Sequence, residues 1–122
     1  MTFSLNTRII RDVVVVDLSG RVTVGESVRQ LSEAVHSHAE QGFSRFVMNL
    51  EAVTYIDSCG LGELVATYTS ICKRDGVVSL LKPSTRTDEL LRMTKLYTVF
   101  AIFDDESEAI AALTARSGRR GA

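Results

Sequence analysis

The chain has 122 residues, the size of one domain, and its 45% hydrophobic and 24% charged residues are typical of a globular protein with a substantial core. A net charge of −1 excludes the strong positive field that attracts nucleic acid, and no apolar run reaches membrane-spanning length. No signal-peptide pattern precedes the first predicted strand, so we expect a cytoplasmic protein without membrane insertion or direct nucleic-acid binding.

Two strands joined by a hairpin are predicted at the start of the chain. Residues 3–10 and 12–19 are rich in β-branched side chains, and the turn between them contains Arg11 and Asp12. Four consecutive valines at 13–16 predict that the second strand is covered on both faces of a sheet.

An amphipathic helix over residues 26–41 and a short buried strand over residues 46–50 are predicted next. Gly42 provides the left-handed end of this helix. Its predicted buried stripe consists of Val28, Leu31, Val35 and Ala39.

The stretch 53–64 is the most distinctive part of the sequence. Asp57 and Ser58 have the side chains best suited to accept hydrogen bonds from the free N–H groups of a helix start. Gly60 and Gly62 keep side chains away from that start, which leaves room for a partner's backbone. The helix that follows has an apolar face made of Leu61, Leu64, Val65, Tyr68, Ile71 and Cys72.

The remaining elements alternate between strand and helix. Residues 77–81 predict a strand that ends before Pro83, and Ser84 or Thr85 caps a helix that carries apolar residues at Leu90, Leu91 and Leu96. Residues 99–103 predict the last strand, and three acids at 104–106 lie at the positive end of a last helix. That helix carries Ile110 and Leu113.

The predicted order of elements is therefore β-β-α-β-α-β-α-β-α. Such an order indicates a single α/β domain over residues 1–115, with a mixed sheet that begins as a hairpin and has about four helices packed against it. We expect residues 116–122, which are small and basic, to form a disordered tail.

Ser58 has two interpretations. As an N-cap it would stabilise the helix by roughly 1 kcal/mol and do nothing else. As an exposed hydroxyl at a glycine-flanked helix start, it would be accessible to a kinase, and a phosphate would add about −1.5 to −2 charges beside Asp57. The helix N-terminus favours such an anion, whereas Asp57 repels it.

The decapeptide YIDSCGLGEL at residues 55–64 closely resembles the phosphorylation-site signature of the bacterial anti-sigma factor antagonists, which are STAS domains. The resemblance extends less specifically over residues 3–113, through the order of strands and helices, and implies the STAS fold. It also implies that Ser58, the serine after the aspartate, is the residue that a partner kinase phosphorylates.

The resemblance implies a phospho-switch. The unphosphorylated protein would bind an anti-sigma factor and so release a sigma factor. The anti-sigma factor, a serine kinase of the histidine-kinase-like ATPase type that uses ATP and Mg²⁺, would phosphorylate Ser58 and dissociate, and a serine phosphatase would reset the cycle. The protein would be a substrate and ligand rather than an enzyme, and would need no cofactor. The expected partner-binding residues are Asp57, Ser58, Cys59, Gly60, Leu61, Gly62, Arg21 and Thr23.

Two positions depart from the family pattern. Members often carry acidic residues just after the second strand, where this chain has Arg21 and Thr23, so its partner is expected to differ in charge. Cys59 stands where serine is common.

A second hypothesis is a STAS scaffold or accessory subunit of a stress-signalling or lipid-transport complex that has no kinase cycle. The intact Asp57–Ser58 pair favours the switch.

Enzymatic and metal-binding alternatives fail on spacing. Ile56 replaces the first glycine of a nucleophile elbow, and His36 and His38 point in different directions on a helix, so neither a catalytic triad nor a metal site is predicted. A helix separates Cys59 from Cys72 by more than the roughly 7 Å between Cα atoms that a disulfide allows. Without a basic neighbour, Cys59 is expected to be a small buried filler rather than a reactive thiolate.

Overall fold

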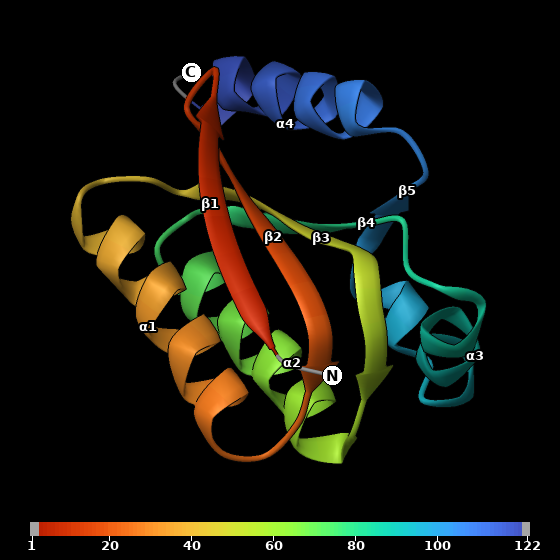
Figure 1. Ribbon diagram of the computed structural model, residues 1–122. Coiled ribbons are helices and arrows are strands. Elements are labelled where there is room, and N and C mark those ends of the chain that lie inside the picture. Colours follow the sequence, from red (N-terminus) through yellow and green to blue (C-terminus); the bar gives the residue numbers. More distant parts are fainter. Residues whose placement is uncertain (1–2, 121–122) are drawn as a thin grey trace.

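A five-stranded mixed sheet in the order β1-β2-β3-β4-β5 forms the centre of the molecule (Figure 1). The computed structural model describes residues 3–120, and for residues 115–120 it describes the backbone only. β2 pairs antiparallel with β1, and every other pair is parallel. The strands are β1 (Ser4–Ile10), β2 (Val13–Val22), β3 (Arg45–Ile56), β4 (Val77–Leu81) and β5 (Ala101–Phe103).

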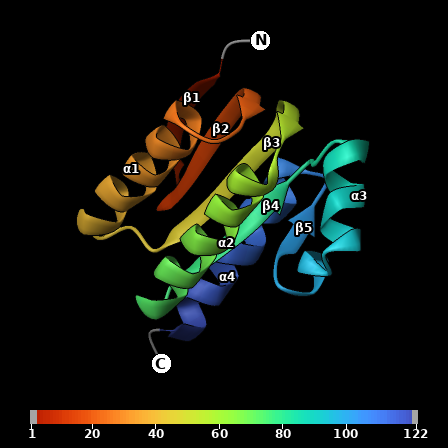
Figure 2. The ribbon, with the colours of Figure 1, turned by 90° about the horizontal axis from the view of Figure 1, so that it is seen from below.

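Helices cover both faces of this sheet. α1 and α2 lie on one face and α4 on the other, while α3 and a short 3-10 helix lie beside the β5 edge (Figure 2). The predicted α/β class, mixed sheet and order of elements are confirmed. The bounds are α1 (Glu26–Glu40), α2 (Ser58–Lys73), α3 (Thr85–Met93), η1 (Leu96–Thr98) and α4 (Glu106–Arg120).

Several boundaries differ from the predicted ones. β2 is longer than expected and extends to Val22. β3 is also longer, because the first four residues of the 53–64 stretch belong to it. Leu96 lies in η1 rather than in α3, since Lys95 adopts a left-handed conformation (φ 63°) that ends the helix. β5 begins at Ala101. The expected tail, residues 116–122, starts within α4, and its last two residues lie outside those described.

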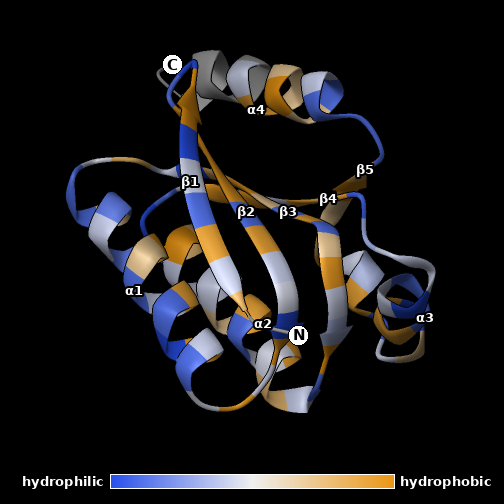
Figure 3. Ribbon diagram, viewed as in Figure 1, coloured by the Kyte–Doolittle hydropathy of each residue, from blue (hydrophilic) through white to orange (hydrophobic). Residues whose placement is uncertain are grey.

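The valine run of β2 confirms a strand buried on both faces. All four valines have no exposed surface. Val14 and Val16 pack into the core beneath α1 and α2, whereas Val13 and Val15 pack under α4. The central strands are accordingly hydrophobic along most of their length (Figure 3). These two cores hold both helical layers to one sheet.

The hairpin between β1 and β2 is confirmed without a glycine in its turn. Ile10 pairs with Val13, and Arg11 (φ 52°) and Asp12 (φ 68°) between them both adopt the left-handed conformation. A two-residue turn with two positive φ values matches the twist of the strands it joins.

Most residues of the two predicted helix faces are buried or pack against the core, and the structure departs from the prediction at a few positions. On α1, Ser27 is buried in place of Val28, and its hydroxyl bonds to both the N–H and the carbonyl of Thr23. On α2, Thr67 is buried whereas Cys72 is exposed. The buried side of α2 is centred on Gly60, Leu64, Thr67 and Ile71, and Cys72 lies outside that stripe.

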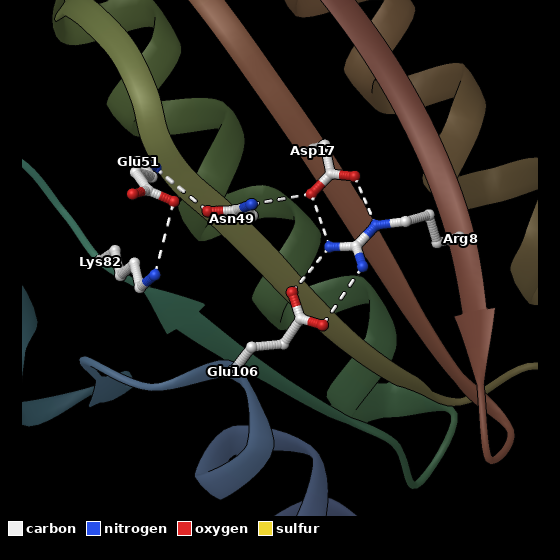
Figure 4. Close-up of polar contacts among 6 residues, drawn as sticks. All are labelled: Arg8, Asp17, Asn49, Glu51, Lys82 and Glu106. Carbon is white, nitrogen blue, oxygen red and sulfur yellow. Dashed lines mark hydrogen bonds and ion pairs between the residues drawn. The ribbon is translucent and has the colours of Figure 1, made fainter.

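A charged network ties the start of α4 to the sheet (Figure 4). The Arg8 guanidinium lies 2.7 Å from a carboxylate oxygen of Asp17 on β2 and 2.7 Å from one of Glu106 on α4. The hydrogen bond from Arg8 lowers the pKa of Glu106. Burial raises the pKa of Asp17, but hydrogen bonds from Arg8 and Asn49 outweigh it and leave that pKa lowered.

The Arg8–Glu106 pair makes a testable contribution to stability. A carboxyl whose pKa is lowered by folding stabilises the protein above its unfolded pKa, about 4.3 for Glu, and loses that contribution as the pH falls through the folded value. Arg8 and Glu106 side chains are 37% and 34% exposed, so solvent screens the pair. We expect Glu106→Gln to lower the free energy of unfolding by about 1 kcal/mol at pH 7 and by much less at pH 3. Urea denaturation at the two pH values measures both losses.

The matched control is Glu108→Gln. Glu108 lies in the same turn of α4, is exposed, and forms no ion pair with a described residue. Its replacement should change the unfolding free energy little at either pH. An equal loss for Glu106→Gln at pH 7 and pH 3 would show that the ion pair is not the source of the effect.

Candidate partner-binding site

Asp57, not Ser58, caps α2. The Asp57 backbone is extended (φ −100°), and its Oδ1 accepts a hydrogen bond of 2.8 Å from the Gly60 N–H. Ser58 is the first residue of the helix, and it is exposed. The interpretation of Ser58 as the N-cap is therefore wrong, because the preceding carboxylate already takes that position.

The same carboxylate joins α2 to the loop after β2. Asp57 Oδ2 accepts a hydrogen bond of 3.2 Å from the Val24 N–H, and the Asp57 N–H donates to the Val22 carbonyl at 3.2 Å. The hydrogen bond from Gly60, with a further one from Val24, outweighs the effect of burial and lowers the pKa of Asp57. Asp57 is thus an ionised, immobilised group immediately before Ser58.

The two glycines of the stretch have different surroundings. Gly60 is buried, and a Cβ atom there would lie 2.2 Å from the Val22 carbonyl oxygen. Gly60 therefore allows α2 to approach β2, which is the role that its buried position shows. A Cβ at Gly62 would meet nothing within 4 Å, so this exposed position does leave room for a partner.

The other residues of the helix start divide into an inner and an outer set. Leu61 is 8% exposed and packs into the core. Cys59 is exposed, so its expected role as a buried filler is wrong: the buried side of α2 is the Gly60 side, and Cys59 lies away from it. Cys59 and Cys72 are both free, as predicted. The outer surface consists of Ser58, Cys59 and Gly62.

Parallel pairing of β2 with β3 brings Arg21 and Thr23 to the same edge of the sheet as Asp57. Arg21 is paired with Tyr55, and its guanidinium carbon lies 4.4 Å from the centre of the Tyr55 ring. Thr23 is half-buried, and its main chain is held by Ser27. The structure therefore places both predicted contact residues beside the start of α2.

Two residues of this edge were missed by sequence reasoning. Tyr55 supports the Arg21 side chain, and Val24 is 70% exposed although it is apolar. The sequence did contain an indication for Val24, because this apolar residue comes directly before Gly25 and belongs to no strand or helix pattern. Nothing in the sequence showed that Tyr55 faces Arg21, because that contact depends on strand register.

Metal-ligating side chains and the two histidines of the described residues do not gather into one site. The described residues contain no group of histidine, cysteine and acidic side chains that could hold a metal ion. His36 pairs with Glu40 at 3.2 Å, and His38 lies 2.8 Å from the Ala34 carbonyl. Of the helices in this part of the chain, none is long and apolar enough to cross a membrane.

Comparison with known proteins agrees with this fold. Residues 4–109 match the family model described as STAS domain. The chain is 28% identical, over 84% of its length and 88% of the relative, to an anti-sigma F factor antagonist of Paenibacillus polymyxa.

Solved structures show the same fold. A candidate anti-sigma factor antagonist of Thermotoga maritima has a TM-score of 0.83 at 25% identity, over 89% of this chain and 93% of that one. The Bacillus cell fate determinant SpoIIAA in its phosphorylated form has a TM-score of 0.71 at 24% identity, over 91% and 98% of the two chains.

Proposed function

The chain belongs to the STAS domain family, and from this we propose that it is an anti-sigma factor antagonist, acting in the cytoplasm and switched off by phosphorylation of Ser58. The name of the Paenibacillus relative supports the general function. The observation that supports the switch is the position of Ser58, exposed as the first residue of α2 beside a cap that does not use its hydroxyl.

At this position, phosphorylation of Ser58 would change the binding surface without disturbing the fold. The Asp57 carboxylate accepts the hydrogen bonds from the Gly60 and Val24 N–H groups that fix the start of α2. A phosphate on Ser58 would therefore break neither of these bonds. The helix N-terminus tolerates the added anion. In a complex, however, a dianion beside the Asp57 carboxylate would be desolvated and repelled by any acidic neighbour, which can cost several kcal/mol.

The proposed partner is an anti-sigma factor that is also a serine kinase of the histidine-kinase-like ATPase type. It would contact the exposed part of the site and transfer the γ-phosphate of ATP to the Ser58 hydroxyl, with Mg²⁺ held by the kinase. A serine phosphatase would reverse the modification. In this cycle the protein is a ligand and a substrate, not a catalyst. The proposed contact residues are Arg21, Thr23, Asp57, Ser58, Cys59 and Gly62. Gly60 and Leu61 would contribute indirectly, because they hold the start of α2 in position.

We expect the anti-sigma factor kinase with ATP and Mg²⁺ to add one phosphate, to Ser58. Tandem mass spectrometry of the product locates the phosphate, and Ser58→Ala should take none while still binding the kinase. Ser84 is an internal control, because it caps α3 and accepts a hydrogen bond from the Thr87 N–H. Phosphate on Ser84 or Thr85 with Ser58 unmodified would contradict the assignment.

A further inference from the structure

Arg21 differs from the arginines that form ion pairs within the chain. Arg8, Arg29 and Arg92 each pair with a carboxylate of the same chain. Arg21 is exposed and stacks on Tyr55, and no described carboxylate forms an ion pair with it. A guanidinium over an aromatic ring is attracted by the ring face, and its N–H groups can still donate to a carboxylate.

A groove on the other side of Tyr55 contains a second arginine, Arg86. The volume of the groove is about 280 Å³, and Arg86 has no ion pair with any described carboxylate. Met93, which contributes to the apolar wall, is 80% exposed. Glu89 is the one acidic residue of the lining, and neither Arg86 nor Arg21 forms an ion pair with it. The lining residues are Tyr55, Ile56, Arg86, Glu89, Leu90 and Met93.

This surface is continuous with the proposed switch. Tyr55 and Ile56 are the last residues of β3, and Asp57 and Ser58 follow them directly. A protein that covers Ser58 therefore meets the groove along the same edge of the sheet. Its contacting segment needs an apolar side chain to fill the groove and a negative charge to match Arg21 and Arg86.

We propose that Arg21 and Arg86, on either side of Tyr55, bind carboxylates of an acidic, apolar segment of the protein that covers Ser58. The identity of that protein rests on the proposed function, whereas the chemistry of its segment does not. Exposed ion pairs of this kind contribute more to the choice of partner than to affinity, because a partner with a basic segment is repelled. Arg21 is thus a specificity-determining residue of the interface.

The first test does not depend on Ser58 or on the kinase. Isotope-labelled full-length protein is titrated by NMR with an acetylated, amidated peptide that alternates leucine and aspartate, and with the matched leucine–asparagine peptide. We expect shifts at Arg21, Tyr55 and Arg86, with about tenfold tighter binding of the aspartate peptide at low salt. The net charge of −1 excludes a general attraction to acidic peptides.

Charge reversal supplies the controls. Arg21→Glu combined with Arg86→Glu should abolish the preference for aspartate, whereas Arg11→Glu, in the hairpin turn at the other end of β2, should leave it unchanged. Melting temperatures of the variants confirm that each is folded. Equal affinity for the two peptides, binding of neither, or a preference that survives the double reversal overturns the inference.

The second test uses the anti-sigma factor kinase and separates the two proposals. We expect Arg21→Glu to weaken its binding about tenfold while phosphorylation of Ser58 remains possible at higher concentration. Unchanged binding of Arg21→Glu, with Ser58 still phosphorylated, overturns the carboxylate inference and leaves the proposed function standing. An aspartate preference in a protein whose Ser58 is never phosphorylated supports the carboxylate site and contradicts the proposed function.

Discussion

Ser58→Asp is expected to weaken binding to the anti-sigma factor by roughly 1–3 kcal/mol, about ten- to a hundred-fold in affinity. The change puts a second carboxylate beside Asp57, which is already ionised and held by the Gly60 and Val24 N–H groups. One carboxylate has less charge than a phosphate, so the loss should be partial. Isothermal titration of both proteins against the same partner measures it.

Stability should hardly change in this variant. Ser58 is the first residue of α2 and its side chain is not the cap, so aspartate removes no capping bond and adds a negative charge at the positive end of the helix. Ser58→Ala is the matched control and should bind like the wild type. Equal affinities of the wild type and Ser58→Asp, with equal melting temperatures, would favour the STAS scaffold or accessory subunit, whose binding needs no phosphate cycle.

Gly60→Ala is expected to destabilise the fold by about 2–4 kcal/mol. The added Cβ would lie 2.2 Å from the Val22 carbonyl oxygen and 2.8 Å from the Ile56 side chain. The carbonyl belongs to β2, which pairs with β3 at this point, so neither backbone can move away cheaply. The start of α2 must shift instead, at the cost typical of overpacked cores. Urea denaturation measures the loss of unfolding free energy.

Gly62→Ala makes the same chemical change two residues further along the helix. A Cβ there meets nothing within 4 Å, so the better helix propensity of alanine should stabilise the protein by roughly 0.5–1 kcal/mol. We therefore expect the free energy of unfolding to fall in Gly60→Ala and to rise in Gly62→Ala. A mild effect of Gly60→Ala, similar to that of Gly62→Ala, would contradict the close contact between α2 and β2.

Residue patterns alone determined much of this fold. Strand and helix periods, together with the Asp57–Ser58 pair and the stop at Pro83, predicted every strand and α-helix of the described chain in the correct order. The valine run of β2 predicted burial on both faces, and the order of elements predicted a mixed sheet that begins as a hairpin. These features depend on residues close together in the sequence, where side-chain periodicity and backbone preference have the largest influence.

Only the tertiary structure decided which neighbours surround the residues of the candidate site. The cap residue Asp57 has a second donor, the Val24 N–H, because the loop after β2 passes beside it, and Gly60 became an inner residue because β2 lies next to it. Arg21 came to lie on Tyr55 through the register of two strands distant in sequence. Burial and charge pairing depend on such neighbours, which no local pattern encodes. Burial and charge pairing in turn decide which residues are available to a partner and which hold the fold together.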